Sequence, residues 1–376
     1  MLSPWVEVGL MKKVCLSVVF FLLLAVVLAG ATEAGNLDVR NVDSNLVIIH
    51  PDGTQEQISS EAGSAAISPD HRAVAFTVVH MQEVQGPEFW RVDAKLLVMT
   101  LSTRVTTELA HPPAGPPGTG FGQVAWTPDG SAIAFEATAR GNGGMEDDLF
   151  LAPFPPERGP VRNLGHWYQG FSFSPDGRRI IHAINSPFAL EVLDVATGTR
   201  TLLHKASNVV WEAKFSPDGK FIAYQKTVGE PASAVQGSED DEPDCGSPDT
   251  ELRLYSLIDG SDTAVSIPKA PPSVYNFSWS PDSRRLAIEL GTEDCESTSG
   301  DAAVFVTSVD QKVQKQISTS SPSVRPAFSP DGSAVAFVDS SQSPARLYRY
   351  DLASETRSVI RRASTKENDY LLLEWK

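Results

Sequence analysis

Apolar and polar residues alternate in short runs along most of this chain, and turn-forming sequences separate the runs. Alternation with a period of two over about four to eight residues is typical of β-strands whose two faces differ. After residue 31 no stretch shows the spacing of an amphipathic helix. The pattern therefore predicts an all-β protein.

One short phrase recurs six times: an apolar or aromatic residue, Ser or Thr, Pro, Asp and usually Gly. The copies are Ile67-Ser68-Pro69-Asp70, Trp126-Thr127-Pro128-Asp129-Gly130, Phe173-Ser174-Pro175-Asp176-Gly177, Phe215-Ser216-Pro217-Asp218-Gly219, Trp279-Ser280-Pro281-Asp282 and Phe328-Ser329-Pro330-Asp331-Gly332. Pro sets φ at the first turn position, Asp accepts hydrogen bonds from nearby N–H groups, and Gly tolerates the positive φ that closes the turn. The phrase therefore predicts the hairpin between the first two strands of a repeated unit.

The residues after each turn predict how the units pack. The fifth residue after the proline is aliphatic, and the sixth is Ala75, Ala134, Ile181, Ala223, Ala287 or Ala336. Small and branched residues on alternate faces suit a strand that lies between two neighbouring sheets. The prolines are 59, 47, 42, 64 and 49 residues apart, and units of this length with four short strands predict a β-propeller.

The two ends of the chain decide the number of blades. Residues 371–376 look like a first strand that stops where its turn would begin, whereas residues 37–42, 46–49 and 54–59 look like strands two to four without a first. Pairing the two ends closes the ring without open sheet edges, which favours seven blades. Six blades with loose ends is the alternative. Residues 32–376 are predicted to form this single domain.

A secretory signal is predicted for residues 1–31. Lys12 and Lys13 precede an apolar stretch from residue 14 to residue 28, and Ala29-Gly30-Ala31 offers small residues for cleavage. We expect export to the periplasm or the extracellular space, with no membrane insertion after cleavage. An uncleaved anchor is the alternative.

The net charge is −16, and it becomes −17 once residues 1–31, which carry a net charge of +1, are removed. Such an acidic chain disfavours nucleic acid and anionic membranes as partners, although the charge also serves solubility. Outside the signal only Cys245 and Cys295 remain, both between the second and third strands of consecutive repeats. In an oxidising compartment they predict a disulfide, with two free thiols as the alternative.

Carboxylates gather around these cysteines. A disulfide would bring together Asp240, Asp241, Asp244, Glu293 and Asp294, and hard oxygen ligands at this density suit Ca²⁺. The acidic run lacks the alternating spacing and the turn glycine of a calcium loop, so a solvated loop is the preferred interpretation and no cofactor is predicted.

The face opposite the uniform turns collects the connections of variable length, and we expect recognition there. It holds the candidate binding residues Trp90, Arg91, His166, Trp167, Tyr168 and Trp211. Aromatic rings beside Arg and His suit protein or glycan contacts, unless several of them pack under the loops. His182 takes a position that is aromatic in other repeats and is predicted to be a packed ring.

The six phrases, each followed by a strand of the Ile-Ala-Phe type, resemble the TolB-type, WD-like β-propeller repeat, without the α/β domain that precedes the propeller in TolB. The resemblance covers nearly all of residues 32–376. It implies a periplasmic protein-binding module, as in the Tol-Pal envelope system, or the cap of a prolyl oligopeptidase, but no Gly-x-Ser-x-Gly elbow occurs.

We therefore expect an exported, monomeric, non-catalytic scaffold that binds an envelope or extracellular protein. The alternative is a carbohydrate-active propeller, either a glycan binder or a metal-assisted, lyase-like enzyme, that uses the same face and its histidines His80, His111 and His166.

Overall fold

The fold is seen in a computed structural model. The structure describes residues 37–41, 46–49, 55–60, 62–83, 90–111, 120–141, 144–167, 170–185, 187–229, 249–266, 273–292, 302–318, 325–339, 346–362 and 370–375. These residues contain no helix that could cross a membrane. The single helical element among them is the 3-10 turn η1 (Pro156–Arg158).

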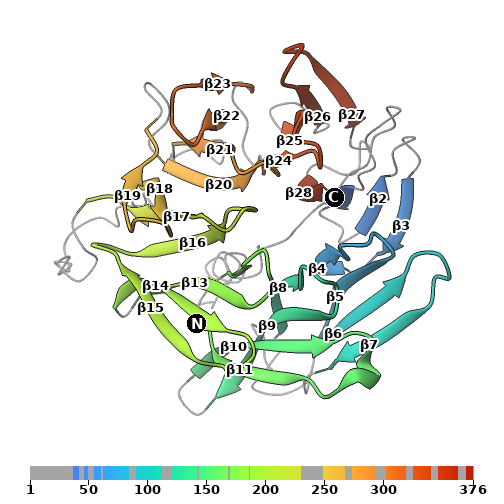
Figure 1. Ribbon diagram of the computed structural model, residues 1–376. Helices are drawn as coiled ribbons and strands as arrows, with labels where there is room; N and C mark the ends of the chain where they lie inside the picture. The colour runs from blue at the N-terminus through green and yellow to red at the C-terminus, as the bar shows by residue number, and fades with distance from the viewer. Residues whose placement is uncertain are drawn as a thin grey trace, which may run out of the picture.

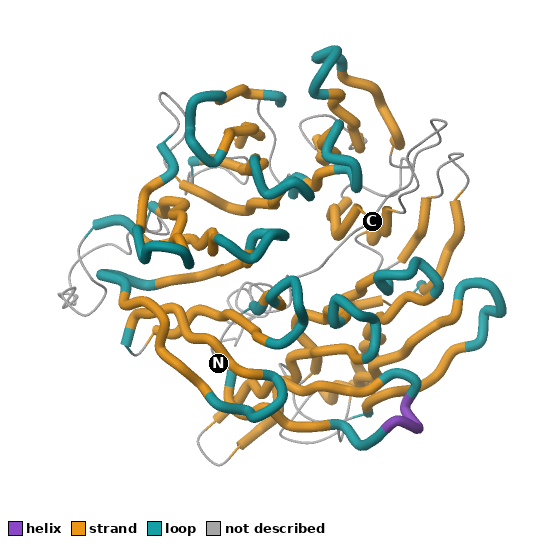
Figure 2. The backbone as a smooth tube through the Cα atoms, in the orientation of Figure 1, coloured by secondary structure: helices purple, strands orange, loops and turns teal. Residues whose placement is uncertain are grey.

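The described strands form seven four-stranded antiparallel sheets arranged around a central axis (Figures 1 and 2). Six sheets consist of consecutive strands: β4 (Ala62–Ile67), β5 (Ala73–Glu83), β6 (Trp90–Thr100) and β7 (Thr106–Ala110); β8 (Gly120–Trp126), β9 (Ala132–Gly141), β10 (Gly144–Pro153) and β11 (Arg162–His166); β12 (Ser172–Phe173), β13 (Arg179–Asn185), β14 (Phe188–Asp194) and β15 (Arg200–Lys205); β16 (Val210–Phe215), β17 (Phe221–Thr227), β18 (Thr250–Ser256) and β19 (Asp262–Ala264); β20 (Ser273–Trp279), β21 (Arg285–Gly291), β22 (Ala302–Ser308) and β23 (Gln314–Gln316); β24 (Ala327–Phe328), β25 (Ala334–Asp339), β26 (Arg346–Asp351) and β27 (Arg357–Arg362). The prediction of an all-β propeller with four-stranded blades is confirmed.

The remaining sheet combines the two ends of the described chain. Its order is β28 (Tyr370–Trp375), β1 (Leu37–Asn41), β2 (Leu46–Ile49) and β3 (Gln55–Ser59). Leu37 pairs with Trp375 and Asn41 pairs with Tyr370 in antiparallel register. β28 lies beside β4 and β24, the first strands of the neighbouring sheets. This is the terminal pairing that a seven-bladed ring requires.

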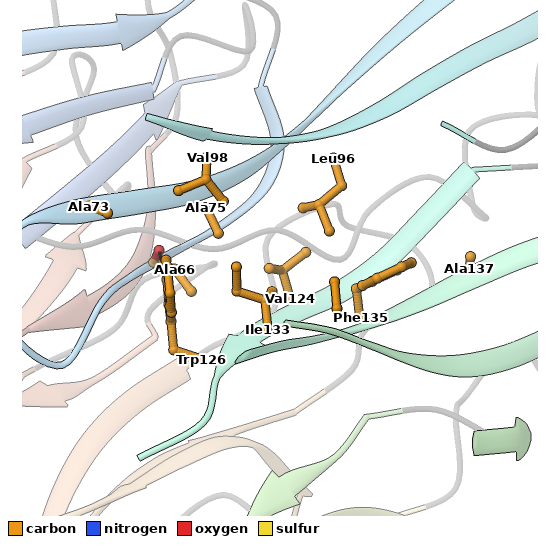
Figure 3. Close-up of a cluster of buried hydrophobic side chains, with 11 residues drawn as sticks. Ala66, Ala73, Ala75, Leu96, Val98, Val124, Trp126, Ile133, Phe135 and Ala137 are labelled. Carbon is orange, nitrogen blue, oxygen red and sulfur yellow. Dashed lines mark hydrogen bonds between the residues drawn. The ribbon is translucent and has the colours of Figure 1, made fainter. Parts of the chain in front are cut away.

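Neighbouring blades pack large side chains against small ones, as Figure 3 shows for the β4–β7 and β8–β11 blades. Ala73 and Ala75 of β5 face Ile133 and Phe135 of β9, and all four are buried. Ala134 lies between Ile133 and Phe135 in β9 and faces the following blade. There it packs in one cluster with Ile180. Strand alternation thus places the large residues toward the preceding blade and the small residue toward the next, which confirms the expected pattern.

Each Ser-Pro-Asp turn is closed by its own side chains. Ser174 Oγ donates to Asp176 Oδ1 at 2.6 Å, and the same aspartate oxygen accepts the backbone N–H of Arg178 at 3.1 Å. The hydroxyl oxygen also accepts the N–H of Arg179 at 2.9 Å, where the second strand begins. The hydrogen bond from Ser174 is the largest cause that holds the pKa of Asp176 below its usual value. The other five turns repeat the hydroxyl–aspartate bond.

The last position of the turn adopts a left-handed conformation in every copy. Gly177 has φ of 69°, and a Cβ added there would lie 3.3 Å from Cδ of Pro128 in the preceding blade. Gly130 lies over Pro69 in the same way. The proline and the glycine of the phrase therefore also pack against one another from blade to blade.

Candidate binding face

The strand order gives the ring two ends. One end, the turn face, carries the Ser-Pro-Asp turns and the turns between third and fourth strands. The other, the loop-rich face, holds the starts of the first and third strands and the ends of the second and fourth strands. By their place along the chain, all six candidate binding residues belong to the loop-rich face.

Trp90 and Arg91 are the first residues of β6 and pair with Glu83 and Gln82 of β5. His166 ends β11 and is exposed. Trp211 lies in β16, and 38% of its surface is exposed. Tyr168 lies outside the described residues, as do Cys245 and Cys295. The five carboxylates of the calcium candidate, Asp240, Asp241, Asp244, Glu293 and Asp294, also lie outside, so the disulfide and the calcium site stay predictions.

Trp167 is not a surface contact, which corrects its place among the candidates. Only 1% of its surface is exposed. Its ring stacks on His182 with centroids 3.7 Å apart, and its indole N–H donates to Gly170 O at 3.2 Å. The guanidinium carbon of Arg200 lies 5.4 Å from its centroid. The ring packs between the β8–β11 and β12–β15 blades. Burial of so large an apolar surface stabilises the fold, so Trp167 serves packing and not recognition.

His182 is a packed ring, as predicted. It is 1% exposed, and its Nε2 lies 2.9 Å from Glu191 Oε1, which also accepts a bond from Arg200 Nη1 at 3.0 Å. The hydrogen bond from His182 is the main cause that lowers the pKa of Glu191. This network joins strands of one blade to Trp167 of the preceding one, so its role is structural.

Trp211 is held at the loop-rich face with part of its ring exposed. Its indole N–H donates to Thr227 Oγ1 of the adjacent strand at 3.0 Å. Val228, the residue that follows Thr227, is 48% exposed. The fixed indole therefore presents apolar surface without the entropy loss that a mobile side chain would suffer on binding.

A β-bulge explains the orientation of this segment. The pairing of β16 with β17 shifts register between Val210 and Ala213, so Trp211 and Glu212 form the bulge. β4, β8 and β20 show a register shift at the corresponding point. Bulges redirect side chains, and the innermost strands use them next to the loop-rich face.

Charged groups adjoin Trp211 along the inner strands. Glu212 Oε1 lies 2.8 Å from Lys214 Nζ, and each side chain is about one-third exposed. Lys214 also donates to Phe277 O of β20 at 2.8 Å and lies 4.6 Å from the Phe277 centroid. Burial lowers the pKa of Arg325, while the carboxylates of Glu212 and Glu289 act against that shift. The site thus combines an aromatic surface with charges of both signs.

Sequence reasoning missed Glu212, Lys214 and Arg325, although a signal for the bulges was present. The eighth residue after the turn proline is polar in four repeats, at Thr77, Glu136, Gln225 and Glu289, within otherwise apolar strands. These residues bond across the bulge or to the next blade: Thr77 Oγ1 accepts Ser64 N–H, Glu136 Oε2 accepts Gln123 N–H, and Gln225 Nε2 donates to Val274 O. A polar residue in that register marks a bulged inner strand.

The turn face holds an open cavity of about 430 Å³ between the β4–β7 and β8–β11 blades. Among its lining residues are Asp70, Arg72, Trp126, Asp129 and Phe154. The indole N–H of Trp126 is already bonded to Ala66 O at 2.9 Å. This cavity lies at the opposite end of the ring from Trp211. Within the described ranges no group of three or more His, Cys, Asp or Glu side chains is arranged to hold a metal ion.

The strand order defines a β-propeller, and its fold is similar to that of TolB. The chain is similar to the solved structure of TolB from Acinetobacter baumannii, with 15% identity, a TM-score of 0.50, and coverage of 83% of this chain and 65% of that one. A putative 6-phosphogluconolactonase from Bacteroides uniformis is 13% identical over 91% of this chain and 97% of its own, with a TM-score of 0.53.

A third similar structure is an oligogalacturonate lyase in complex with manganese, at 13% identity and a TM-score of 0.52, covering 89% of this chain and 86% of that one. No protein-family model matches the chain, and no curated protein matches it in sequence. At such low identity the structural similarity shows a shared fold alone, so the function has to be argued from the site.

Proposed function

We propose that this chain is an exported, non-catalytic propeller that binds another protein of the cell envelope or the extracellular space through its loop-rich face. Residues 1–31 serve as the export signal in this proposal. The half-buried indole of Trp211 carries it, because Trp is the residue most enriched among those that dominate binding energy. The hydrogen bond to Thr227 orients the ring before a partner arrives.

The charges around Trp211 support a protein partner. The Glu212–Lys214 pair is partly solvated, so a partner with an opposite charge pattern can pair with it at little desolvation cost. A fixed aromatic residue bordered by mixed charges corresponds to the apolar centre and polar rim of protein interfaces.

The test uses the chain from Thr32 onward, immobilised and exposed to an envelope extract of the source organism, with retained proteins identified by mass spectrometry. We expect Trp211→Ala to lose the protein that the unchanged chain retains, with a loss of affinity of about tenfold or more.

Ile258→Ala is the matched control, because Ile258 is 70% exposed in the turn between β18 and β19, at the opposite face of the same blade. It should retain the partner. Equal retention by Trp211→Ala would place the interface elsewhere. Retention of glycan in place of protein would support the carbohydrate alternative.

A further inference from the structure

A second surface lies at the rim of the ring, away from Trp211. β27 is the outermost strand of its sheet, so one side of its backbone has no partner strand among the described residues. Arg357, Ser358 and Val359 follow one another in this strand and are all exposed, Val359 by 40%. An exposed edge of this length can accept an additional strand.

This rim is basic in an acidic protein. The two outer strands of the blade carry five arginines within a chain of net charge −16: Arg346, Arg349, Arg357, Arg361 and Arg362. Arg346 stands directly opposite Arg362 in the strand pairing. Arg346 Nε is buried, with no hydrogen-bond partner among the described residues. A carboxylate brought by a partner would add an acceptor for these arginines.

The outer strand β15 offers a direct contrast. It has the same length and is also basic, but Arg200 bonds to Glu191 at 3.0 Å and His204 lies 3.2 Å from Asp262. Two of its three basic side chains thus have acidic partners within the propeller, and only Lys205 at its end is exposed. In β27, Arg357 lies 4.4 Å over the Tyr348 ring, and no carboxylate of the described residues pairs with it. Its charge is available to a partner.

The register adds a pattern to the charge. Arg357 pairs with Tyr350, and Val359 pairs with Tyr348, so these two residues of β27 share one face of the sheet. The edge therefore presents a cation and an apolar side chain two residues apart. Because the residues of a strand that share a face lie two apart, a matching partner has an acidic residue at one position and an apolar residue two positions later.

We infer that β27 binds an extended acidic segment of another protein, which adds to this blade as a further strand. Backbone hydrogen bonds to β27 supply the alignment, and carboxylates of the segment pair with the arginines. Edge charges also prevent aggregation, but that purpose does not need the apolar Val359 beside Arg357 on the same face. The inference is independent of the Trp211 surface.

The test titrates the full chain with a capped eight-residue peptide that repeats Glu-Ser-Val-Ser, so that Glu and Val share one face of the strand, and follows binding by calorimetry and by hydrogen exchange. We expect binding that weakens with salt, with slower exchange of the β27 amides. Arg357→Glu should weaken binding about tenfold or more, because an attractive pair becomes a repulsive one. Trp211→Ala should bind the peptide like the unchanged chain.

Two controls separate strand addition from simple charge attraction. Lys205→Glu makes the same charge change at the end of β15 and should leave the affinity within about twofold, since that edge takes no peptide. The same peptide with alternate backbone nitrogens methylated should bind at least about tenfold more weakly. Equal binding of the methylated peptide, equal loss in Lys205→Glu, or binding of heparin but not of the peptide would each overturn the inference.

Discussion

At the scale of single residues, Glu136 shows how the bulged inner strands use polar side chains. Its Oε2 accepts the N–H of Gln123 at 2.9 Å, whereas its Oε1 is buried with no hydrogen-bond partner among the described residues. Burial is the main cause that raises its pKa to about 7, and the nearby carboxylate of Asp147 acts in the same direction. The folded protein therefore keeps this carboxyl protonated up to a higher pH than the unfolded chain does.

Stability should depend on pH through this group. A carboxyl whose pKa is higher in the folded state than in the unfolded state stabilises fully below the unfolded pKa, and that contribution is lost as pH rises through the folded value. Between about pH 4.5 and 7 the free energy of unfolding should fall by about 1–3 kcal/mol from Glu136.

Glu136→Gln should remove most of that decline and raise the stability at pH 8, as measured by urea unfolding across the pH range. Glu157→Gln is the control, because it removes one carboxylate from the exposed η1 turn of the same blade. An unchanged pH slope in Glu136→Gln would contradict the assignment.

At the scale of elements, the repeated turn depends on one backbone conformation. Its last position is Gly in four copies but His71 in the first and Ser283 in the fifth, with φ of 58° and 60°. A left-handed conformation costs a residue with a Cβ roughly 1–2 kcal/mol. Ser283 recovers part of that cost, because its Oγ accepts the N–H of Asp218 in the preceding blade at 2.8 Å.

Substitutions at this position should therefore have opposite signs. His71→Gly should stabilise the protein by about 0.5–1 kcal/mol, because it relieves the left-handed strain and the imidazole makes no described hydrogen bond, ion pair or ring contact. Gly177→Ala should destabilise it by about 1–2 kcal/mol, because the new Cβ meets Pro128 as well as the backbone strain. Urea unfolding midpoints measure both changes.

Ser283→Gly provides the matched comparison. It removes the same strain but also the bond to Asp218, so its gain should be smaller than that of His71→Gly. Equal gains would mean that this hydrogen bond between blades contributes nothing.

The cross-strand pairs between the second and third strands vary more from blade to blade than the turns do. Phe135 of β9 stacks on Phe150 of β10 with centroids 5.4 Å apart, and the matching pair in the next blade is His182 with Glu191. One blade further, Tyr224 of β17 pairs with Arg253, and the Tyr224 hydroxyl donates to Asp262. The same register position thus accepts an aromatic stack or a network of ion pairs and hydrogen bonds.

At the scale of the whole molecule, the sheet that joins both ends completes the ring. β28 supplies the innermost strand to β1, β2 and β3 and lies beside β4, β24 and β25. Without it, β1 and the blades on both sides would lose their neighbour. Closed rings protect sheet edges in this way.

Ending the chain after Asp369 should therefore lower the free energy of unfolding by at least about 3 kcal/mol, a large part of the 5–15 kcal/mol typical of domains. Urea unfolding followed by circular dichroism measures the loss, and removal of Lys376 alone is the control. A synthetic peptide of residues 370–376 should restore part of the stability. An unchanged midpoint after removal of β28 would show that the ring does not depend on this strand.

The sequence determined the features that depend on neighbours along the chain. Pro, Asp and Gly in the repeated phrase specify a turn locally, and the alternation around Ala134 specifies a strand with one small face. Six copies of the same unit cannot bury their faces alone, so the propeller follows from the repeat. The sequence also showed that His182 takes a position that is aromatic in other repeats.

Only the tertiary structure decided what each side chain meets. Trp167 looked exposed because it follows a loop-forming stretch, but His182 of the next blade and Arg200 cover it. Lys214 gains its role from Phe277, 63 residues away. His204 of β15 likewise meets Asp262 of the next blade, 58 residues away. Contacts of this kind join residues far apart in the chain, so no local pattern specifies them.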